Sequence, residues 1–342
     1  MKERLLGKTP SELSQVALAC GLPAFAGKQM AQWLYQKRVG EMEQMTNLSK
    51  AGRQALTEKY EPGRVAPTDV QTSRDGTRKY LFPFGEGAGI ETVMIPDGER
   101  KTLCVSSQAG CKMNCRFCMT GRQGFHGNLS AADILNQFFS VDEAAQLTNA
   151  VFMGMGEPMA NLDAVLKAID YFHRKDTFDL SLRRITISTS GVVPGIEKLA
   201  ETNLPIRLAV SLVTADDTQR DELMPVNRAF HLAELKKALE AYQEGGGKRF
   251  TFEYCMMSGV NTTESSAKKL AAYVKGLDVV MNLIPYNEAA ELPWKRPDMK
   301  EISKFCHYLD MFGVNYTIRN SKGRGVNGAC GQLATKTKEQ LS

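Results

Sequence analysis

The spacing of hydrophobic residues divides the chain into three stretches, each of which predicts a different kind of structure. In the first stretch, apolar positions recur with the period of an amphipathic helix. We predict helices over Ser11–Cys20 and Lys28–Lys37, separated by Gly21-Leu22-Pro23, and a third from the cap at Ser49 to about Tyr60. The pattern indicates a small helical module ahead of the rest of the chain.

Residues 64–106 alternate apolar and polar positions with a period of two, which is typical of β-strands. Asp-Gly pairs at 75–76 and 97–98 favour tight turns between such strands. They predict two hairpins, which pair Asp69–Ser73 with Arg78–Phe82 and Gly89–Pro96 with Thr102–Ser106.

From about residue 130 to 318, short apolar runs alternate with longer helical patterns. This rhythm predicts parallel strands joined by helices, as in a parallel barrel or a partial barrel. With the strand near Leu103, the sheet has six or seven strands, short of the eight of a closed barrel. The expected fold class is therefore α/β, a partial (β/α)6 barrel. Strands are predicted at 150–153, 184–188, 206–211, 249–253, 279–284 and 315–318, and helices at 131–143, 162–174, 195–201, 232–245, 264–277 and 299–312.

Three of the eight cysteines, Cys111, Cys115 and Cys118, lie at the spacing C-x3-C-x2-C. A structural zinc site needs four closed ligands, and the sequence has no second C-x2-C or H-x3-H pair to complete one. Three thiolates from one loop can instead hold three irons of a [4Fe-4S] cluster and leave the fourth iron open. The alternatives are three ordinary buried thiols or part of a zinc site. Cys255 and Cys306 have no chemical neighbours in the sequence, and we assign them to the core.

Polar residues follow several predicted strands at their carboxyl ends, where parallel barrels place catalytic groups. They lie in Gly154–Pro158, Ser188–Gly191, Ser211–Val213 and Leu283–Asn287. Asn287 offers both a donor and an acceptor, which suits an adenine edge or an amino-acid group. Each stretch alone is ordinary loop chemistry, but four of them downstream of the cysteine motif favour a cofactor site.

Three further residues have a chemical and a plain interpretation. Cys330 lies in the glycine-rich, cationic stretch Arg319–Leu333, where Arg and Lys favour the thiolate, but taken alone it is better interpreted as an incidental cysteine in a mobile tail. Cys104 is either a reactive thiol or an apolar strand residue. Glu91, in an otherwise apolar strand, is either a surface carboxylate or a buried acid.

Composition and charge narrow the class of protein. The 342 residues are 43% hydrophobic and 24% charged, as in ordinary globular proteins. No apolar stretch approaches the length of a membrane span and no secretory pattern begins the chain, so we expect a cytoplasmic protein. Residues 1–64 and 315–342 each carry a net charge of +4, against +5 for the whole chain. Two basic ends fit a polyanion such as RNA, with Lys28, Lys37 and Arg38 as candidate contacts, and fit a solvated surface equally well.

These stretches together resemble the RlmN family, the radical S-adenosylmethionine RNA methyltransferases that methylate adenine at C2. The resemblance covers nearly the whole chain. It rests on Gly89–Val93, Leu103–Cys118, Gly121–Phe125, Met153–Pro158, Ser188–Pro194, Asn282–Asn287 and Ala329–Leu333.

The resemblance implies a role for each matching residue. Cys111, Cys115 and Cys118 hold a [4Fe-4S] cluster whose open iron chelates S-adenosylmethionine, two molecules of which are used per turnover. Cys330 carries the methyl group, Cys104 forms a transient disulfide with it, and Glu91 accepts a proton. The implied cofactor-binding residues are Gly156, Glu157, Ser188, Ser211, Leu212, Val213 and Asn287.

The implied activity is methylation of C2 of an adenine in the peptidyl-transferase region of 23S rRNA, and of the adenine 3′ of the anticodon in tRNA. It proceeds through an S-methylcysteine and a 5′-deoxyadenosyl radical. It needs an external one-electron reductant of the flavodoxin type, and we expect a monomer that does not bind membranes. One alternative is a Cfr-like enzyme, which shares the cluster, cysteines and mechanism but methylates C8. The other is an RNA-binding assembly protein with a structural cluster.

The resemblance also implies four parts and leaves two departures. The parts are an RNA-binding accessory domain at 1–63, a β-hairpin extension at 64–96, a radical S-adenosylmethionine core at 97–318 and a loop at 319–342 with the methyl-accepting cysteine. Val213 stands where the family commonly has His, so it contributes at most its backbone. Val326-Asn327-Gly328 replaces a more acidic stretch, which we expect to alter loop mobility more than chemistry.

Overall fold

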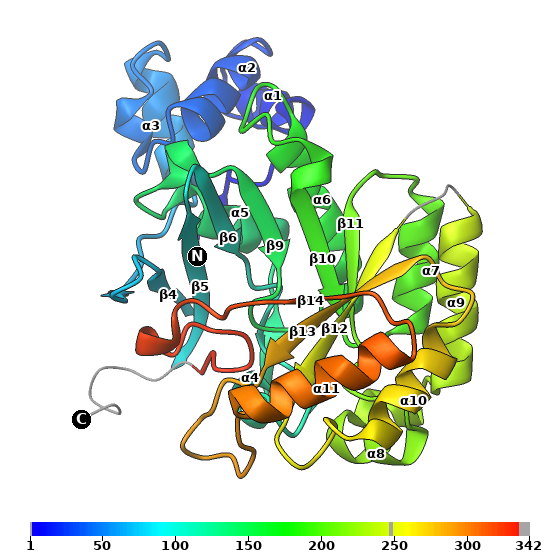
Figure 1. Ribbon diagram of the computed structural model, residues 1–342. Helices are drawn as coiled ribbons and strands as arrows, with labels where there is room; N and C mark the ends of the chain where they lie inside the picture. The colour runs from blue at the N-terminus through cyan, green and yellow to red at the C-terminus, as the bar shows by residue number, and fades with distance from the viewer. Residues whose placement is uncertain (1, 246–248, 335–342) are drawn as a thin grey trace.

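The fold is organised by one ten-stranded sheet (Figure 1). The computed structural model describes residues 2–245 and 249–334. Seven neighbouring strands, β6 and β9 to β14, run parallel, and β5, β4 and β3 continue the sheet from β6 in antiparallel order. The strands are β3 (Asp69–Thr72), β4 (Arg78–Phe84), β5 (Ala88–Asp97), β6 (Arg100–Cys104), β9 (Asn149–Phe152), β10 (Ile185–Thr189), β11 (Arg207–Ser211), β12 (Phe250–Met256), β13 (Val279–Pro285) and β14 (Tyr316–Ile318).

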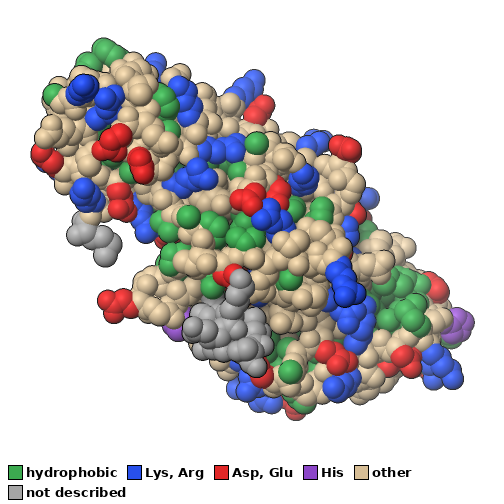
Figure 2. Space-filling view, turned by 90° about the vertical axis from the view of Figure 1, so that its left-hand side faces the viewer, with side chains coloured by type: hydrophobic (Ala, Val, Ile, Leu, Met, Phe, Trp, Pro, Cys, Tyr) green, Lys and Arg blue, Asp and Glu red, His purple; other side chains and the backbone are tan. Residues whose placement is uncertain are grey.

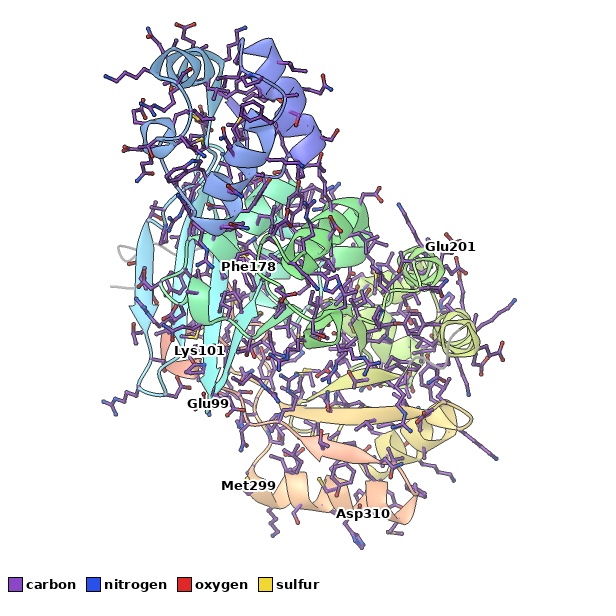
Figure 3. The ribbon with its side chains drawn as sticks, turned by 90° about the horizontal axis from the view of Figure 1, so that it is seen from above. Glu99, Lys101, Phe178, Glu201, Met299 and Asp310 are labelled. Atoms are coloured by element: carbon purple, nitrogen blue, oxygen red, sulfur yellow. The ribbon has the colours of Figure 1, made fainter. Side chains whose placement is uncertain are left out.

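Helices join each parallel strand to the next and cover one face of the sheet, as Figures 1 and 3 show. They are α5 (Ala131–Phe139), α6 (Leu162–His173), α7 (Val193–Glu201), α8 (Asp217–Leu223), α9 (Leu232–Glu244), α10 (Glu264–Val274) and α11 (Met299–Met311). In Figure 3, the labelled Met299 and Asp310 mark the two ends of α11 at the outer side of the layer. The α/β partial (β/α)6 barrel is confirmed, with six connections between the seven parallel strands. Within residues 2–245 and 249–334, none of the helices has the length and apolar character needed to cross a bilayer.

The two hairpins form as their turns predict, and they extend the main sheet. Asp69 pairs with Leu81 and Thr72 with Arg78 across the first turn, and Asp97 pairs with Arg100 across the second. The stretch that we named an extension is therefore hydrogen-bonded to the barrel edge at β6, and the part boundaries stay a prediction.

The helical module is closed by its own hydrogen bonds. Helix α1 (Pro10–Ala19) begins at a capping box, in which the Thr9 hydroxyl accepts from the Glu12 N–H and the Glu12 carboxylate accepts from the Thr9 N–H at 2.6 Å. The other elements are β1 (Glu3–Arg4), α2 (Ala26–Ala31), a π-helical turn at Gln32–Gln36, a 3₁₀ turn at Met42–Gln44, α3 (Lys50–Lys59) and β2 (Tyr60–Glu61), which pairs with β1 in parallel.

An aromatic cluster packs this module onto α5 and α6. Tyr35 lies between Phe139 and Tyr171, with ring centroids 6.0 and 5.0 Å away. Phe178, labelled in Figure 3, packs at 4.6 Å from Phe139. The buried Tyr35 hydroxyl accepts from the Gly7 N–H at 3.0 Å and donates to the Lys8 carbonyl at 2.6 Å. Burial raises the pKa of Tyr35, so the phenol stays neutral.

Tyr35→Phe should lower the free energy of unfolding by about 1–2 kcal/mol, because a buried N–H and a buried carbonyl lose their partner. Urea denaturation followed by circular dichroism measures the change. Tyr316→Phe is the matched control, because its hydroxyl makes a longer contact of 3.3 Å with Asp310 at the surface. Equal losses in the two variants would contradict the role of Tyr35.

Candidate active site

The three motif cysteines lie on a loop between two short antiparallel strands, β7 (Gln108–Gly110) and β8 (Phe125–Asn128). Gly110 has φ +72°, and a Cβ there would lie 2.0 Å from the Gly124 carbonyl oxygen. Only glycine can therefore carry the chain into Cys111, whose N–H donates to that same carbonyl at 2.8 Å. The sequence analysis missed this hairpin because its strands are only three and four residues long.

A cavity of about 180 Å³, here called the cluster-loop cavity, collects the motif cysteines and the carboxyl ends of several strands. The polar stretches at the ends of the predicted strands therefore lie around one cavity with the motif cysteines. Of the residues named from the sequence, the cavity is lined by Cys111, Cys115, Cys118, Gly156, Glu157, Ser188, Ser211, Val213 and Asn287. Leu212 is the exception, because its side chain is fully buried in the core and does not line the cavity.

Glu157 ties the loop after β9 to the loop after β10. Its buried carboxylate accepts hydrogen bonds from the Ser190 N–H at 2.7 Å, the Ser190 hydroxyl at 2.8 Å and the Met159 N–H at 3.0 Å. Burial raises the pKa of Glu157, and the bonds from Ser190 act against this shift. Glu157 therefore shapes the cavity wall through protein contacts.

Gly156 makes room for neighbouring backbone rather than for a ligand. It has φ +97°, and a Cβ there would lie 2.5 Å from the Gln108 Cβ and 2.7 Å from the Gln108 nitrogen. We expected this glycine to let the backbone come close to a ligand, but in the structure it lets the loop after β9 come close to Gln108 in β7.

A fully buried guanidinium holds the next two strand ends together. Arg220 donates to the carbonyl of Ser190 at 2.6 Å, of Leu212 at 3.1 Å and of Ser211 at 3.2 Å. It also donates to Asn227 Oδ1 at 2.9 Å. Arg220 lies in α8, a short polar helix that the sequence analysis did not predict.

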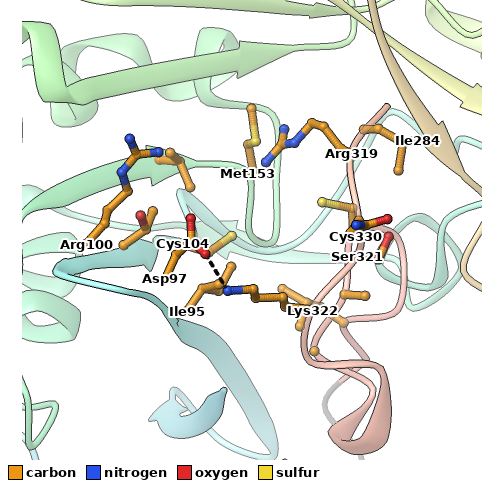
Figure 4. A pocket seen from close by; sticks show the side chains of 16 residues that line it. Ile95, Asp97, Arg100, Cys104, Met153, Ile284, Arg319, Ser321, Lys322 and Cys330 are labelled. Carbon is orange, nitrogen blue, oxygen red and sulfur yellow. Dashed lines mark hydrogen bonds and ion pairs between the residues drawn. The ribbon is translucent and has the colours of Figure 1, made fainter. Parts of the chain in front are cut away.

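A second cavity of about 290 Å³, the tail cavity, contains Cys104 and Cys330 (Figure 4). Figure 4 shows the two thiols on opposite sides of the cavity, which Arg319 and Lys322 also line. Cys330 also lines the cluster-loop cavity, so the two cavities adjoin at its side chain. Met153, Ile284 and Leu333 line both cavities as well.

Burial raises the pKa of both thiols. For Cys104 the desolvation is reinforced by Cys330, and the positive charge of Arg319 acts against it. Cys330 is exposed toward the cavities, but protein atoms surround its sulfur, and this desolvation raises its pKa while Arg319 lowers it. Arg319 is therefore the cation that favours the thiolate at both positions.

The tail that carries Cys330 is bound to the core at several points. The Met119 N–H donates to the Gly331 carbonyl at 2.8 Å, and the Thr120 hydroxyl donates to the Leu333 carbonyl at 2.8 Å. The Asn287 amide donates to the Cys330 carbonyl at 3.2 Å. Residues 335–342 of the predicted C-terminal loop lie outside the described residues.

Glu91 is a buried acid, which decides between the two interpretations of this residue. Its side chain is 1% exposed, and one oxygen lies 2.7 Å from Lys79 Nζ while the other accepts from the Ala334 N–H at 2.7 Å. Burial raises the pKa of Glu91, and Lys79 acts against this shift. Glu91 lines neither cavity, because residues 333–334 of the tail lie against it.

Two family models and several known proteins are similar to this chain. Residues 4–61 match the family model of the ribosomal RNA large subunit methyltransferase N-terminal domain, and residues 105–270 match that of the radical SAM superfamily. The "Probable dual-specificity RNA methyltransferase RlmN" of Porphyromonas gingivalis is 46% identical over 98% of both chains. This chain belongs to the RlmN family. The "Dual-specificity RNA methyltransferase RlmN" of Desulfotalea psychrophila is 42% identical over 95% of this chain and 92% of its own.

The RlmN-family fold extends to a solved structure. The crystal structure of a radical SAM methyltransferase from Sphaerobacter thermophilus is 36% identical, covers 97% of this chain and 99% of that one, and has a TM-score of 0.91. The chain is thus a radical S-adenosylmethionine RNA methyltransferase, whose cofactors are a [4Fe-4S] cluster and S-adenosylmethionine.

The cluster-loop cavity fits the cofactors of the RlmN family. Burial raises the pKa of Cys111 to about 12 and that of Cys115 well above its usual value, so these thiols are protonated unless a cation lies beside them, and cluster irons would supply that charge. Among the described residues, no three His, Cys, Asp or Glu side chains are placed to hold a single metal ion. A cluster does not require such a point, because each thiolate binds a different iron. Asn287 Oδ1 is buried without a partner among the described residues, which leaves an acceptor for a cofactor donor.

Two residues of this RlmN-family site escaped the sequence analysis. Glu253 lines the cluster-loop cavity and lies 3.3 Å from Arg319 of the tail cavity. The signal was present, since Glu253 interrupts an apolar strand as Glu91 does. Cys255 packs against a small hydrophobic cluster that includes Met257 and Tyr286, and it also lines the cluster-loop cavity, whereas Cys306 is in the main core as expected.

Both departures from the RlmN-family pattern have a definite place. Val213 has φ +64°, a left-handed conformation that is strained for a β-branched residue. Its carbonyl accepts from the Asn261 amide at 2.8 Å and its side chain is buried beside Met224 and Tyr286. These contacts explain the position of Val213 without a ligand, and its contribution of at most backbone to the cofactor site stays a prediction. Residues 326–328 belong to a tight turn in which the Gly328 N–H donates to the Gly323 carbonyl at 2.9 Å.

Gly156→Ala should weaken S-adenosylmethionine binding roughly tenfold or more, because the new Cβ would displace the loop that carries Glu157. Isothermal titration of the reconstituted protein measures the affinity. Gly259→Ala is the matched control, because Gly259 also has a positive φ, +68°, but a Cβ at that residue would meet no atom within 4 Å. Equal affinity for Gly156→Ala and wild type would contradict this account of the wall.

Proposed function

We propose that this enzyme methylates C2 of an adenine in 23S rRNA and in tRNA, with Cys330 as the methyl carrier. The observation that carries the proposal is the position of Cys330, which lines both the cluster-loop cavity and the tail cavity. A group that lies at such a junction can take a methyl from one side and present it to a base on the other.

The cluster-loop cavity would hold the cofactors. Cys111, Cys115 and Cys118 would ligate the cluster, and Asn287 would orient S-adenosylmethionine through its free acceptor. When bound, this pair supplies the methyl group and the radical that activates it. Gly156 and Glu157 contribute by fixing the wall against β7 and the β10 loop.

The tail cavity would receive the adenine. A base inside a helix cannot reach it, so the nucleotide has to be unstacked first. Arg100 and Lys322 line the cavity and suit the negative charge of a nucleotide phosphate. Lys322 already bridges to the Pro96 carbonyl at 2.6 Å and to Asp97 at 2.8 Å, which fixes its position at the rim.

The two thiols would act in sequence. Cys330, favoured as a thiolate by Arg319, takes the methyl on its sulfur. The S-methyl group first loses one hydrogen atom, and its carbon then bonds to C2; the adduct loses the C2 proton and one electron, which the bound cofactors would take up. Cys104 then attacks the Cys330 sulfur, so that a disulfide forms as the sulfur–carbon bond breaks, and the released carbon takes up a proton to give the methylated base. Glu91 takes the C2 proton, which requires residues 333–334 to move away from its carboxylate. The RlmN names of the relatives favour C2 over the Cfr-like C8 product.

A monomer of this enzyme with a flavodoxin-type reductant would suffice for turnover. The helical module at residues 1–63 would supply affinity for RNA. Lys37 is exposed, with its ammonium 3.6 Å from the Trp33 ring centroid. Arg38 was named as a candidate RNA contact, but its guanidinium packs over the Phe178 ring, 5.2 Å from the ring centroid. Figure 2 shows Lys and Arg side chains spread among acidic ones over the upper lobe and the body, so contact with RNA would be distributed.

Cys104→Ala should accumulate a covalent protein–RNA adduct, because nothing remains to break the link between Cys330 and the base. Cys330→Ala should carry no RNA and leave adenine unmethylated. Protein from expressing cells is denatured, and bound RNA and modified nucleosides are measured by mass spectrometry. The opposite pattern would mean that the two roles are reversed, and 8-methyladenosine as product would establish the Cfr-like alternative.

Lys28→Glu with Lys37→Glu should weaken RNA binding and flatten its salt dependence, because lysines contact phosphates and each contact releases counterions. Filter binding at several salt concentrations measures the slope. Lys300→Glu on α11 is a control of equal charge change per site outside the module. If the slope of the double variant matches that of the control, Lys28 and Lys37 belong to ordinary surface.

A further inference from the structure

A buried ion pair lies beneath the tail and is not explained by cofactor binding. Lys79 in β4 and Glu91 in β5 are 5% and 1% exposed, and their charged groups are 2.7 Å apart. In the register of the two strands, Leu81 pairs with Glu91 and Lys79 pairs with Val93, so the two side chains are diagonal neighbours on one face. The strands thus hold the pair in fixed geometry.

The carboxylate of this pair binds the tail. Glu91 Oε1 faces Lys79, whereas Oε2 accepts the Ala334 N–H at 2.7 Å. Ala334 is four residues beyond Cys330, and the intervening Leu333 lines both cavities. A hydrogen bond to a carboxylate is about twice as strong as a neutral one, so the charge on Glu91 matters to the position of the tail.

Lys79 is what keeps that charge in a buried site. Desolvation favours the neutral acid, and Lys79 acts against it at close range. Without the cation, the carboxylate would be buried and uncompensated, and it would take up a proton or turn away from the tail. Either change weakens the bond to Ala334.

We propose that Lys79 is a positioning residue, which acts through Glu91 to dock the Ala334 end of the tail and so holds Cys330 at the junction of the two cavities. The assignment deepens the proposed function, on which the role of Cys330 rests, but the docking itself is a property of the protein without RNA or cofactor. It also means that the group proposed as proton acceptor is the docking group, so the tail has to release Glu91 before Glu91 can reach a base.

Amide hydrogen exchange of the full-length holoenzyme, followed by mass spectrometry, tests the docking. Exchange in peptides that end the tail at residues 330–334 reports the Ala334 N–H, and exchange in β11 reports global stability. In Lys79→Met, the tail amide should exchange about tenfold faster, the expected effect of weakening a charge-assisted bond. Lys79→Arg, which restores a cation, should recover much of the protection.

A double variant separates docking from folding. Lys79→Met with Glu91→Leu leaves no unpaired charge in the core, so the fold should persist while the acceptor for Ala334 is gone. Lys198→Ala is the control, because it removes an exposed lysine that pairs with Asp163 at 2.6 Å. We expect faster tail exchange in the double variant, with β11 unchanged in both.

Two outcomes overturn the proposal. One is wild-type tail exchange in the folded double variant, and the other is equal acceleration in the tail and in β11. Neither depends on methylation, so an error in the proposed function would appear in the thiol variants while the exchange result stood.

Discussion

The position of Cys330 depends on one constraint, which is that the tail at residues 330–334 packs directly against the cluster loop. The hydroxyl of Thr120 and the carbonyl of Leu333 are hydrogen-bonded at 2.8 Å although they lie 213 residues apart in the sequence. Met119 and Thr120 follow Cys118 without a break, so the backbone that places the third cluster cysteine also places the tail. Cys330 and the loop of the three motif cysteines are therefore fixed relative to one another by short hydrogen bonds between the tail and residues 119–120.

Buried charges stiffen the walls around this contact. Arg220 ties the carbonyls after β10 to those after β11, and Glu157 ties the β9 loop to Ser190. Glu253 spans the gap to Arg319 at the start of the tail. Such groups are costly to bury unless every partner is in place, so each of them favours a single arrangement of its loops. The walls of the cluster-loop cavity are therefore held in place by the protein's own buried charges.

The fold could be predicted from the sequence because most helices and strands are long enough to show their period. Helix α8 was missed because it has only seven residues and little apolar pattern. The strand ends could be expected to lie together, since parallel strands bring their carboxyl ends to one edge, and they line the cluster-loop cavity. Leu212 does not line the cavity with its neighbours Ser211 and Val213, because its side chain is buried in the core, and its role in cofactor binding stays a prediction.

The sequence could not show which cation pairs with each buried carboxylate. A carboxylate in an apolar strand signals a buried acid, but nothing in the sequence says which cation neutralises it. Lys79 reaches Glu91 through strand register, and Arg319 reaches Glu253 across 66 residues. Both pairings depend on the three-dimensional packing of distant segments, which periodicity does not report.

The separation of the two cavities gives a physical reason for the proposed role of Cys330 as methyl carrier. Met153, Ile284 and Leu333 lie between the cluster-loop cavity and the tail cavity, because they line both. A base in the tail cavity would be kept from the cluster loop by these side chains, whereas Cys330 lines both cavities. A carrier thiol can cross this wall by a small rotation of one side chain, and the base and the cofactor then never need to share one cavity.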